Sequence, residues 1–239
     1  MSLRSHVMSR MNHLGQHIGP DLDGWEPPLP IAPTTLVGRT VTLEPIERTR
    51  HAIPLFHAYR GAPEQLWTYL PWGPFTDAAE LGQLLDALAE RDDQVPFASV
   101  SDNEIVGFLE YLRMSPEAGT IEIGGITWSP ALQRSTASTE SIFLLIDHAF
   151  ANGYRRVEWK CDDLNAPSRR AALRYGFTYE GTFRKATHYK GRSRDTAWYA
   201  ITNDEWPRLK MRLQTWLDPA NFTQQGNQIR SLAQILVGR

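Results

Sequence analysis

One stretch of this 239-residue sequence decides the fold: Thr120-Ile-Glu-Ile-Gly-Gly-Ile-Thr-Trp128, then Ser129-Pro-Ala-Leu-Gln-Arg-Ser-Thr-Ala-Ser138, then Thr139-Glu-Ser-Ile-Phe-Leu-Leu-Ile-Asp-His-Ala-Phe150. The three segments predict a strand, a loop of small and polar residues, and a helix with apolar residues at helical spacing that Gly153 ends. A helix N-terminus presents free backbone N–H groups and the positive end of the helix dipole. The stretch therefore predicts a phosphate site, with an ordinary strand-to-helix connection as the alternative.

A second motif follows at Asn165-Ala-Pro-Ser168-Arg-Arg-Ala-Ala-Leu-Arg-Tyr-Gly176-Phe177. Together the two motifs resemble the GNAT acetyltransferases, whose acetyl-coenzyme A loop has the pattern Gln/Arg-x-x-Gly-x-Gly/Ala at the start of a helix. Asn-x-x-Ser before a short helix that ends in Gly-Phe is similar to the Rim-type branch, which acetylates protein N-termini and related amines. Tyr69-Leu-Pro-Trp72-Gly-Pro-Phe75 and the segment 191–207 resemble that branch as well, so the likeness covers about residues 36–217.

The loop departs from the family pattern at both glycines, which are replaced by Thr136 and Ser138. Glycine lets a backbone approach pyrophosphate without a side chain in the way. The two hydroxyl groups could instead donate hydrogen bonds to phosphate, or they could crowd it out. The sequence leaves both outcomes open.

The resemblance implies an α+β GNAT fold, in which helices flank a mixed, mainly antiparallel twisted sheet with a central splayed parallel strand pair. Residue patterning predicts strands at 37–46, 96–100, 104–114, 120–128, 156–161, 179–189 and 195–201. It predicts helices at 49–59, 63–69 and 204–217, and one that begins at a cap on Thr76 or Asp77. We expect a proline-rich arm at 1–35 anchored by Trp25, loose at its start, then the acetyltransferase domain at 36–217 and a tail at 218–239.

Composition narrows the class of protein. The 25 basic and 27 acidic residues give a net charge of −2, so we expect no nucleic-acid or membrane partner bound through bulk electrostatics. A lone cysteine, Cys161, excludes an intramolecular disulfide and a Cys-rich zinc site, and the scattered histidines predict no metal. The first residues lack a signal-peptide core, and no apolar run could span a bilayer. These features favour a cytoplasmic protein and leave a homodimer open.

The resemblance also implies which residues hold acetyl-coenzyme A. They come from the end of the central strand, the loop, the helix start and the second motif: Ile126, Thr127, Trp128, Gln133, Arg134, Ser135, Thr136, Ala137, Ser138, Thr139, Asn165 and Ser168.

Acetylation of an amine needs a base for the ammonium group, a stabiliser for the oxyanion and a proton for the thiolate. Glu122 resembles the strand glutamate that is the base in several GNAT enzymes, although it could equally be an ion-paired strand carboxylate; Glu110 is the reserve. Ser168 is the expected proton donor, with a helix cap as its alternative role. Ala172 stands where many GNAT enzymes have a tyrosine, so a tyrosine is not expected to supply that proton. Backbone N–H groups at 125–127 would meet the oxyanion.

The acceptor pocket is predicted at the aromatic residues near Pro71-Trp-Gly-Pro74, which could also be ordinary core. The expected acceptor-binding residues are Tyr69, Trp72, Glu110, Glu122 and His188.

The sequence thus predicts an N-acetyltransferase that moves an acetyl group from acetyl-coenzyme A directly to a primary amine on a protein N-terminus or a small molecule. The alternatives are another acyl donor, such as succinyl-coenzyme A, and a non-catalytic binding or sensor protein on the same fold.

Overall fold

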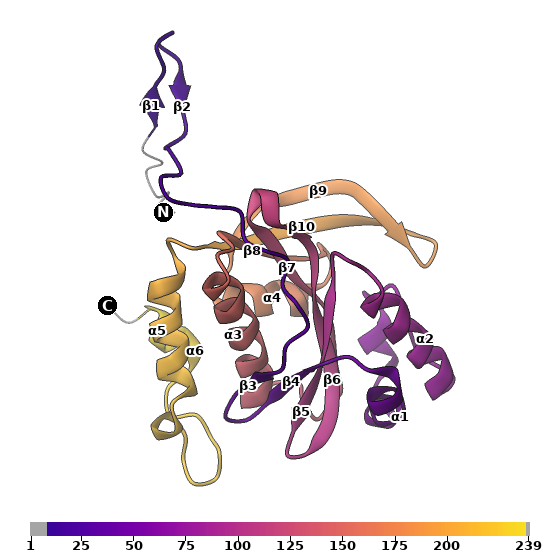
Figure 1. The fold of residues 1–239 in the computed structure, drawn as a ribbon. Coiled ribbons are helices and arrows are strands. Elements are labelled where there is room, and N and C mark those ends of the chain that lie inside the picture. Colours follow the sequence, from indigo (N-terminus) through magenta and orange to yellow (C-terminus); the bar gives the residue numbers. More distant parts are fainter. Residues whose placement is uncertain (1–8, 238–239) are drawn as a thin grey trace.

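The computed structural model describes residues 9–237 and contains one mixed sheet of eight strands (Figure 1). The strand order is β3-β4-β5-β6-β7-β8-β10-β9. The strands are β3 (Leu36–Val37), β4 (Thr42–Pro45), β5 (Val95–Ser101), β6 (Glu104–Ser115), β7 (Thr120–Trp128), β8 (Arg156–Asp162), β9 (Thr178–Tyr189) and β10 (Arg192–Thr202).

One pair of neighbours, β7 and β8, runs parallel, and the other neighbouring pairs are antiparallel. Among the described residues, β7 and β8 pair at three positions, the last of which joins Glu122 to Glu158. Beyond that point the two strands separate. The expected splayed parallel pair at the centre of an α+β sheet is therefore present.

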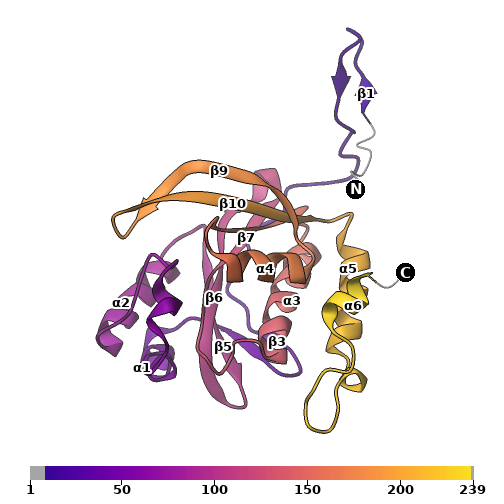
Figure 2. The same ribbon diagram turned by 180° about the vertical axis from the view of Figure 1, so that it is seen from behind.

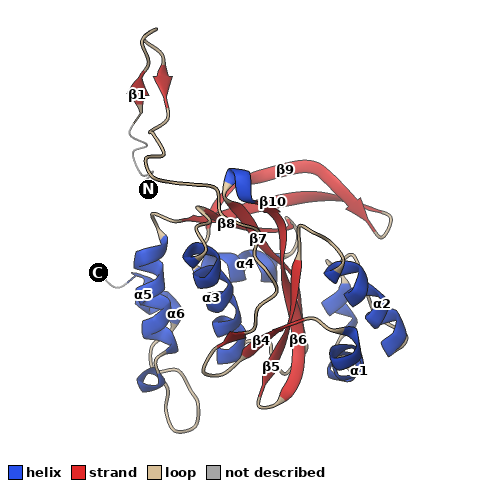
Figure 3. Ribbon diagram, in the orientation of Figure 1, coloured by secondary structure: helices blue, strands red, loops and turns tan. Residues whose placement is uncertain are grey.

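Helices cover both faces of the sheet (Figures 2 and 3). On one face, α1 (Arg48–Ala58) and α2 (Ala78–Ala89) bury Leu55, Leu81 and Leu85 against Phe108 of β6. On the other face, α3 packs with Ile121 and Ile123 of β7 in a larger cluster. The remaining helices are α3 (Thr136–Ala151), α4 (Ala166–Tyr175), α5 (Trp206–Leu217) and α6 (Leu232–Val237), with 3-10 turns at η1 (Glu64–Trp67), η2 (Pro116–Ala118) and η3 (Pro219–Asn221).

The expected first strand at 37–46 is instead two short strands, β3 and β4, joined by a turn. Glu140 of α3 explains the break, because its carboxylate accepts hydrogen bonds from the backbone N–H groups of Arg39 (2.9 Å) and Thr40 (2.6 Å). The acceptor lies about a hundred residues along the chain, so the local pattern at 37–46 does not reveal the turn.

The central helix also begins earlier than expected, at Thr136 rather than Thr139. Ser135 is its N-cap, with its hydroxyl oxygen 3.0 Å from the backbone N–H of Ser138. A serine hydroxyl satisfies one of the free N–H groups of a first turn, so the helix can start as soon as Ser135 is available. Three residues expected in the loop are therefore the first turn of α3.

The N-terminal arm is more ordered than expected. A small hairpin of β1 (Arg10–Met11) and β2 (His17–Ile18) stands away from the rest of the molecule (Figure 1), while residues 1–8 of the segment lie outside the described residues. Trp25 fixes the arm to the domain: its indole N–H donates to the backbone oxygen of Gly153 (3.1 Å), and its ring packs against the Arg155 guanidinium.

The segment after α5 is folded onto the domain as far as residue 237. Asn221 is buried, and its amide nitrogen donates to the backbone oxygens of Trp216 and Arg230. Leu232 and Ile235 of α6 pack in the larger core cluster. Within residues 9–237, no helix has the length and apolarity that a membrane span requires.

We predict that Glu140→Ala lowers the free energy of unfolding by about 2–4 kcal/mol, because two backbone N–H groups would lose a charged acceptor that is 6% exposed. Denaturant unfolding measures the loss. The matched control is Glu117→Ala at an exposed site, which should stay within about 0.5 kcal/mol of the wild type. Equal effects of the two changes would contradict this account of the β3–β4 turn.

Candidate active site

A cleft of about 1470 Å³ runs through the middle of the sheet. Its walls include Glu122 and Lys160, and also Ile123 and Trp159, whose side chains pack in the core on the other face. Successive residues of a strand point to opposite faces, so a cavity lined by both sets passes through the gap between β7 and β8. One end lies against η1 and the loop after it, and the other lies at the N-terminus of α3.

The α3 end of the cleft has the chemistry of an anion site. The N–H groups of Thr136 and Ala137 are in the first helical turn, where no intrahelical acceptor exists. The guanidinium-bearing residues Arg134, Arg170 and Arg174 line the same end. Coenzyme A carries a pyrophosphate and a 3′-phosphate, and these donors and cations fit such groups.

The replacement of the second family glycine does not block this end. The Ser138 hydroxyl donates to the backbone oxygen of Ser135 (2.7 Å), so the side chain folds back along the first turn. Ser138 is 2% exposed. Thr136, at the first glycine position, lines the cleft and is half-buried. The side chains of Thr136 and Ser138 therefore leave room for a phosphate group, although neither family glycine is present.

Most of the expected cofactor residues line the cleft: Ile126, Trp128, Gln133, Arg134, Thr136, Ser138, Thr139, Asn165 and Ser168. The others do not. Thr127 is fully buried; its backbone oxygen accepts from the Tyr59 hydroxyl (2.6 Å) and its hydroxyl from the Trp72 indole N–H (3.1 Å). Ser135 is the helix cap and Ala137 is buried beneath the first turn. Thr127 therefore stabilises the end of β7 and does not line the cleft.

The second motif places Ser168 at the cleft in a way the sequence left open. Asn165, not Ser168, is the N-cap of α4, and its amide oxygen accepts from the backbone N–H of Ser168 (3.1 Å). The Ser168 hydroxyl oxygen accepts from the indole N–H of Trp159 (3.0 Å). The same hydroxyl also hydrogen-bonds the Cys161 side chain. Cys161 lies nearby on the cleft wall, and burial raises the pKa of its thiol, which keeps it protonated at neutral pH.

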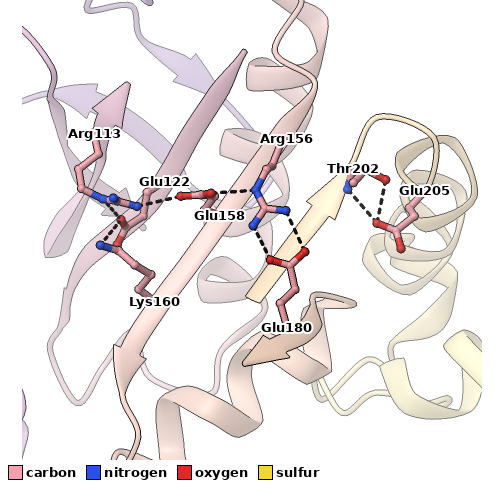
Figure 4. Close-up of polar contacts among 8 residues, drawn as sticks. All are labelled: Arg113, Glu122, Arg156, Glu158, Lys160, Glu180, Thr202 and Glu205. Atoms are coloured by element: carbon pink, nitrogen blue, oxygen red, sulfur yellow. Dashed lines mark hydrogen bonds and ion pairs between the residues drawn. The ribbon is translucent and has the colours of Figure 1, made fainter. Parts of the chain in front are cut away.

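Glu122 is held by two cations (Figure 4). Its carboxylate lies 2.6 Å from Nε of Arg113 and 3.2 Å from Nζ of Lys160. The Arg113 guanidinium also contacts Glu158 (2.8 Å), which Arg156 contacts from the other side (2.8 Å). Burial raises the pKa of Glu122, and Lys160 and Arg113 oppose that rise. This geometry favours the ion-paired interpretation of Glu122.

Glu110 is the opposite case. It is 2% exposed and lines the cleft, and its Oε2 atom has no hydrogen-bond partner among residues 9–237. Burial, and then the negative charge of Glu122, raise the pKa of Glu110 to about 8. A buried, unpaired carboxyl group that titrates near neutral pH is typical of a functional site.

A strand bulge makes room for the Glu110 carboxyl group. The β6–β7 register shifts between Phe108 and Glu110, and Gly125 has φ +59°. A Cβ atom on Gly125 would lie 2.2 Å from Oε1 of Glu110. The pair Gly124-Gly125 therefore marks a strand bulge, at which a side-chain carboxyl group approaches the backbone closely.

The opposite end of the cleft receives part of the expected aromatic cluster. Tyr69 and Trp72 line the cleft, whereas Trp67 and Phe75 pack edge to face in the core under α1 and α2. His188 is exposed on β9 and is not part of the lining. The expectation that His188 completes the pocket therefore finds no support in the geometry.

The tip of the β9–β10 hairpin fixes this end. Lys190 Nζ donates to three backbone oxygens, those of Trp67 (2.9 Å), Trp72 (3.0 Å) and Gly73 (2.8 Å). Arg192 donates to the backbone oxygen of Thr68 (2.6 Å). The loop that presents Tyr69 and Trp72 is thus fastened to a hairpin more than a hundred residues away in sequence.

Comparison with known proteins now identifies the family. A family profile described as an acetyltransferase (GNAT) domain matches residues 40–178, which is more than half of the chain. The chain belongs to the GNAT acetyltransferases. It is an N-acetyltransferase that uses acetyl-coenzyme A.

Individual relatives support this assignment. The crystal structure of a GCN5-related N-acetyltransferase from Brucella melitensis is 40% identical, has a TM-score of 0.86 and covers 90% of this chain and 99% of its own. Mycobacterium smegmatis RimJ in complex with CoA-disulfide shares the fold at 23% identity and a TM-score of 0.64, covering 77% of this chain and 94% of its own. An uncharacterized N-acetyltransferase, YnaD of Bacillus subtilis (strain 168), is 24% identical over 139 residues, 58% of this chain and 81% of its own.

Sequence reasoning missed several residues of this GNAT site, among them Arg113 and Lys160 as partners of Glu122, Lys190 as the loop clamp, and Gln94. Gln94 lines the cleft, and its buried side-chain oxygen has no partner within the described chain. The turn at Asp102-Asn103 alone would pair Pro96 with Leu109. A register shift between Ser99 and Val100 pairs Pro96 with Glu110 instead, which brings the start of β5 beside that carboxyl group and which the local sequence does not reveal.

We predict that Lys190→Met speeds amide hydrogen exchange of residues 67–73 by about tenfold or more, because three charge-assisted hydrogen bonds to backbone oxygens are lost. Exchange measured by mass spectrometry tests this. Lys185→Met, an exposed lysine change on the same hairpin, is the control and should leave those peptides unchanged. Unchanged exchange in both variants would show that the loop holds itself.

A second prediction concerns stability and pH. Folding raises the pKa of Glu110 from 4.5 to about 8, so the folded state holds a proton that the unfolded state releases, and stability from this group is lost as pH rises through that window. Glu110→Gln removes this loss. The melting temperature of the variant relative to wild type should therefore rise between pH 5 and pH 9, by about 10 °C. A constant difference across that range would mean that Glu110 is ionised throughout.

Proposed function

We propose that this GNAT enzyme transfers the acetyl group directly from acetyl-coenzyme A to a primary amine, with Glu110 as the general base. The observation that carries the proposal is the isolation of the Glu110 carboxyl group in the cleft, beside the bulge at Gly125. Glu122 supports the reaction indirectly, since its charge helps to raise the pKa of Glu110.

Acetyl-coenzyme A supplies the acetyl group as a thioester, and the residues of the chain act on the acceptor and on the charges that develop. Glu110 removes a proton from the acceptor ammonium group and so leaves a neutral, nucleophilic amine. Backbone N–H groups at 125–127, beside the bulge, donate to the oxyanion. Ser168, on the cleft wall beside Cys161, gives its hydroxyl proton to the departing sulfur.

The pKa of Glu110 favours one class of acceptor. An α-amino group has a pKa of about 7.7–8.0, close to that of Glu110, whereas a lysine side chain has a pKa of about 10.4. Proton transfer to Glu110 is then nearly balanced for an α-amine and uphill by about two pKa units for lysine. This match supports a protein N-terminus or a small molecule with an α-amine as the acceptor. Tyr69 and Trp72 supply an apolar wall, and the Gln94 amide supplies a polar partner next to the amine.

We predict that Glu110→Gln lowers kcat by about 10²–10⁴-fold while acetyl-coenzyme A still binds, because the amide cannot accept the proton. The assay uses an amine that the wild type accepts from a panel of short peptides and small amines. In the wild type, kcat/KM should rise with pH with an inflection near pH 8, since the base works in its ionised form.

Glu122→Gln is the matched control, with the same change of charge on the neighbouring strand. It should keep measurable turnover and move the inflection of the pH profile to lower pH, because the loss of a nearby negative charge lowers the pKa of Glu110. Thermal melts of both variants check folding. If Glu122→Gln abolishes turnover and Glu110→Gln does not, the base is Glu122 and the proposal is wrong.

A further inference from the structure

The C-terminal segment reaches the cofactor end of the cleft. Phe222, Gly226, Asn227 and Gln228 line the cleft together with Trp216, a buried residue of the last turn of α5. All five lie beyond residue 178, where the match to the family profile stops. Figure 1 places the loop between α5 and α6 at the same end of the molecule as the start of α3. A part of the chain outside the matched region therefore forms a wall of the cleft.

Hydrogen bonds hold this loop, residues 222–228, in one shape. The backbone N–H of Thr223 donates to the oxygen of Asn227 (2.9 Å), and that of Gly226 donates to the oxygen of Thr223 (2.9 Å). The Trp216 indole N–H donates to Oε1 of Gln228 (3.0 Å). Buried Asn221 closes the base of the loop through both ends of its amide. The loop is thus a preformed wall, and binding a ligand against it would cost little ordering.

The guanidinium group of Arg174, on α4, packs against two aromatic rings beside the loop. Its guanidinium carbon lies 5.1 Å from the centre of the Trp216 ring and 5.3 Å from that of Tyr175. One guanidinium nitrogen donates to the Thr139 hydroxyl (3.0 Å) on the first turns of α3. Arg174 therefore connects the expected pyrophosphate site to the C-terminal loop as a fixed positive charge that packing holds in place.

Packing alone does not account for the loop tip. Trp216 and Asn221 are buried and complete the core, whereas Asn227 and Gln228 are exposed and present amide groups at the cleft. Amides that border a cationic, partly aromatic wall suit a ligand that carries both a heterocyclic base and a phosphate.

We propose that the loop 222–228 and Arg174 bind the 3′-phosphoadenosine half of acetyl-coenzyme A and make the enzyme selective for the free thioester over the same acyl-phosphopantetheine on a carrier protein. A carrier protein offers no nucleotide to this wall, and free phosphopantetheine is the matching probe. The inference rests on the proposed function for its donor and concerns residues that the transfer step does not use.

The test is calorimetric binding at 0.15 M salt of coenzyme A, 3′-dephospho-coenzyme A and 4′-phosphopantetheine. The variant is Asn227→Asp, which puts a negative charge on the cleft side of the loop. Its control is Gln224→Glu, the same change of charge on the same loop away from the cleft, where screening limits long-range effects. A second variant, Arg174→Gln, removes the fixed cation.

We expect Asn227→Asp to weaken coenzyme A binding by about tenfold, dephospho-coenzyme A by less and phosphopantetheine not at all, with Gln224→Glu like wild type. Arg174→Gln should bring the affinities for coenzyme A and dephospho-coenzyme A close together. Equal weakening of all three ligands, or no change for any, would overturn the proposal. Wild-type protein that binds coenzyme A but acetylates no amine would instead contradict the proposed function and leave this inference standing.

Discussion

The site depends on the short pairing between β7 and β8, which divides the sheet at its centre. Three positions pair, and after Glu122 and Glu158 the strands part. At this last pair, Arg113 on β6 contacts both carboxylates, so one guanidinium holds three strands together where the sheet divides. The cleft, its access to the N-terminus of α3 and the space beside Gly125 all follow from this division. A sheet that stayed paired along β7 would have no passage for a thioester.

The two buried glutamates of the cleft show how environment separates like groups. Glu122 has two cations within 3.2 Å, and Glu110, on the adjacent strand, has none within hydrogen-bond distance in the described structure. Each environment also depends on the other, because the charge retained on Glu122 disfavours a second charge on Glu110. Two carboxyl groups whose surroundings push their properties apart are a common basis for dividing structural and acid–base roles.

Local patterns predicted much of the fold. The bounds of β7 agree with the sequence to the residue, because alternating β-branched residues and a following proline define them. The start of α3 was placed three residues late, since Ser135, Ser138 and Thr139 are all plausible caps and tertiary structure selects the first. The turn between β3 and β4 could not be predicted, because its acceptor is Glu140.

The candidate site was predictable in composition and less so in geometry. Glu110 and Glu122 could both be identified as candidates, yet only the β6–β7 register decides which has partners, and the bulge at Gly125 shifts that register. Residues that act from a distance in sequence, such as Lys190 on the loop at 67–73 and Arg174 beneath Trp216, carry no local signal. Each depends on where a hairpin or a terminal segment returns to the domain.

A passage through a sheet has two mouths. One opens beside Tyr69 and Trp72, and the other opens between the start of α3 and the C-terminal loop. In the reaction proposed above, donor and acceptor enter by separate mouths and meet where β7 and β8 part. Binding of the acceptor then does not require that coenzyme A first leave the cleft.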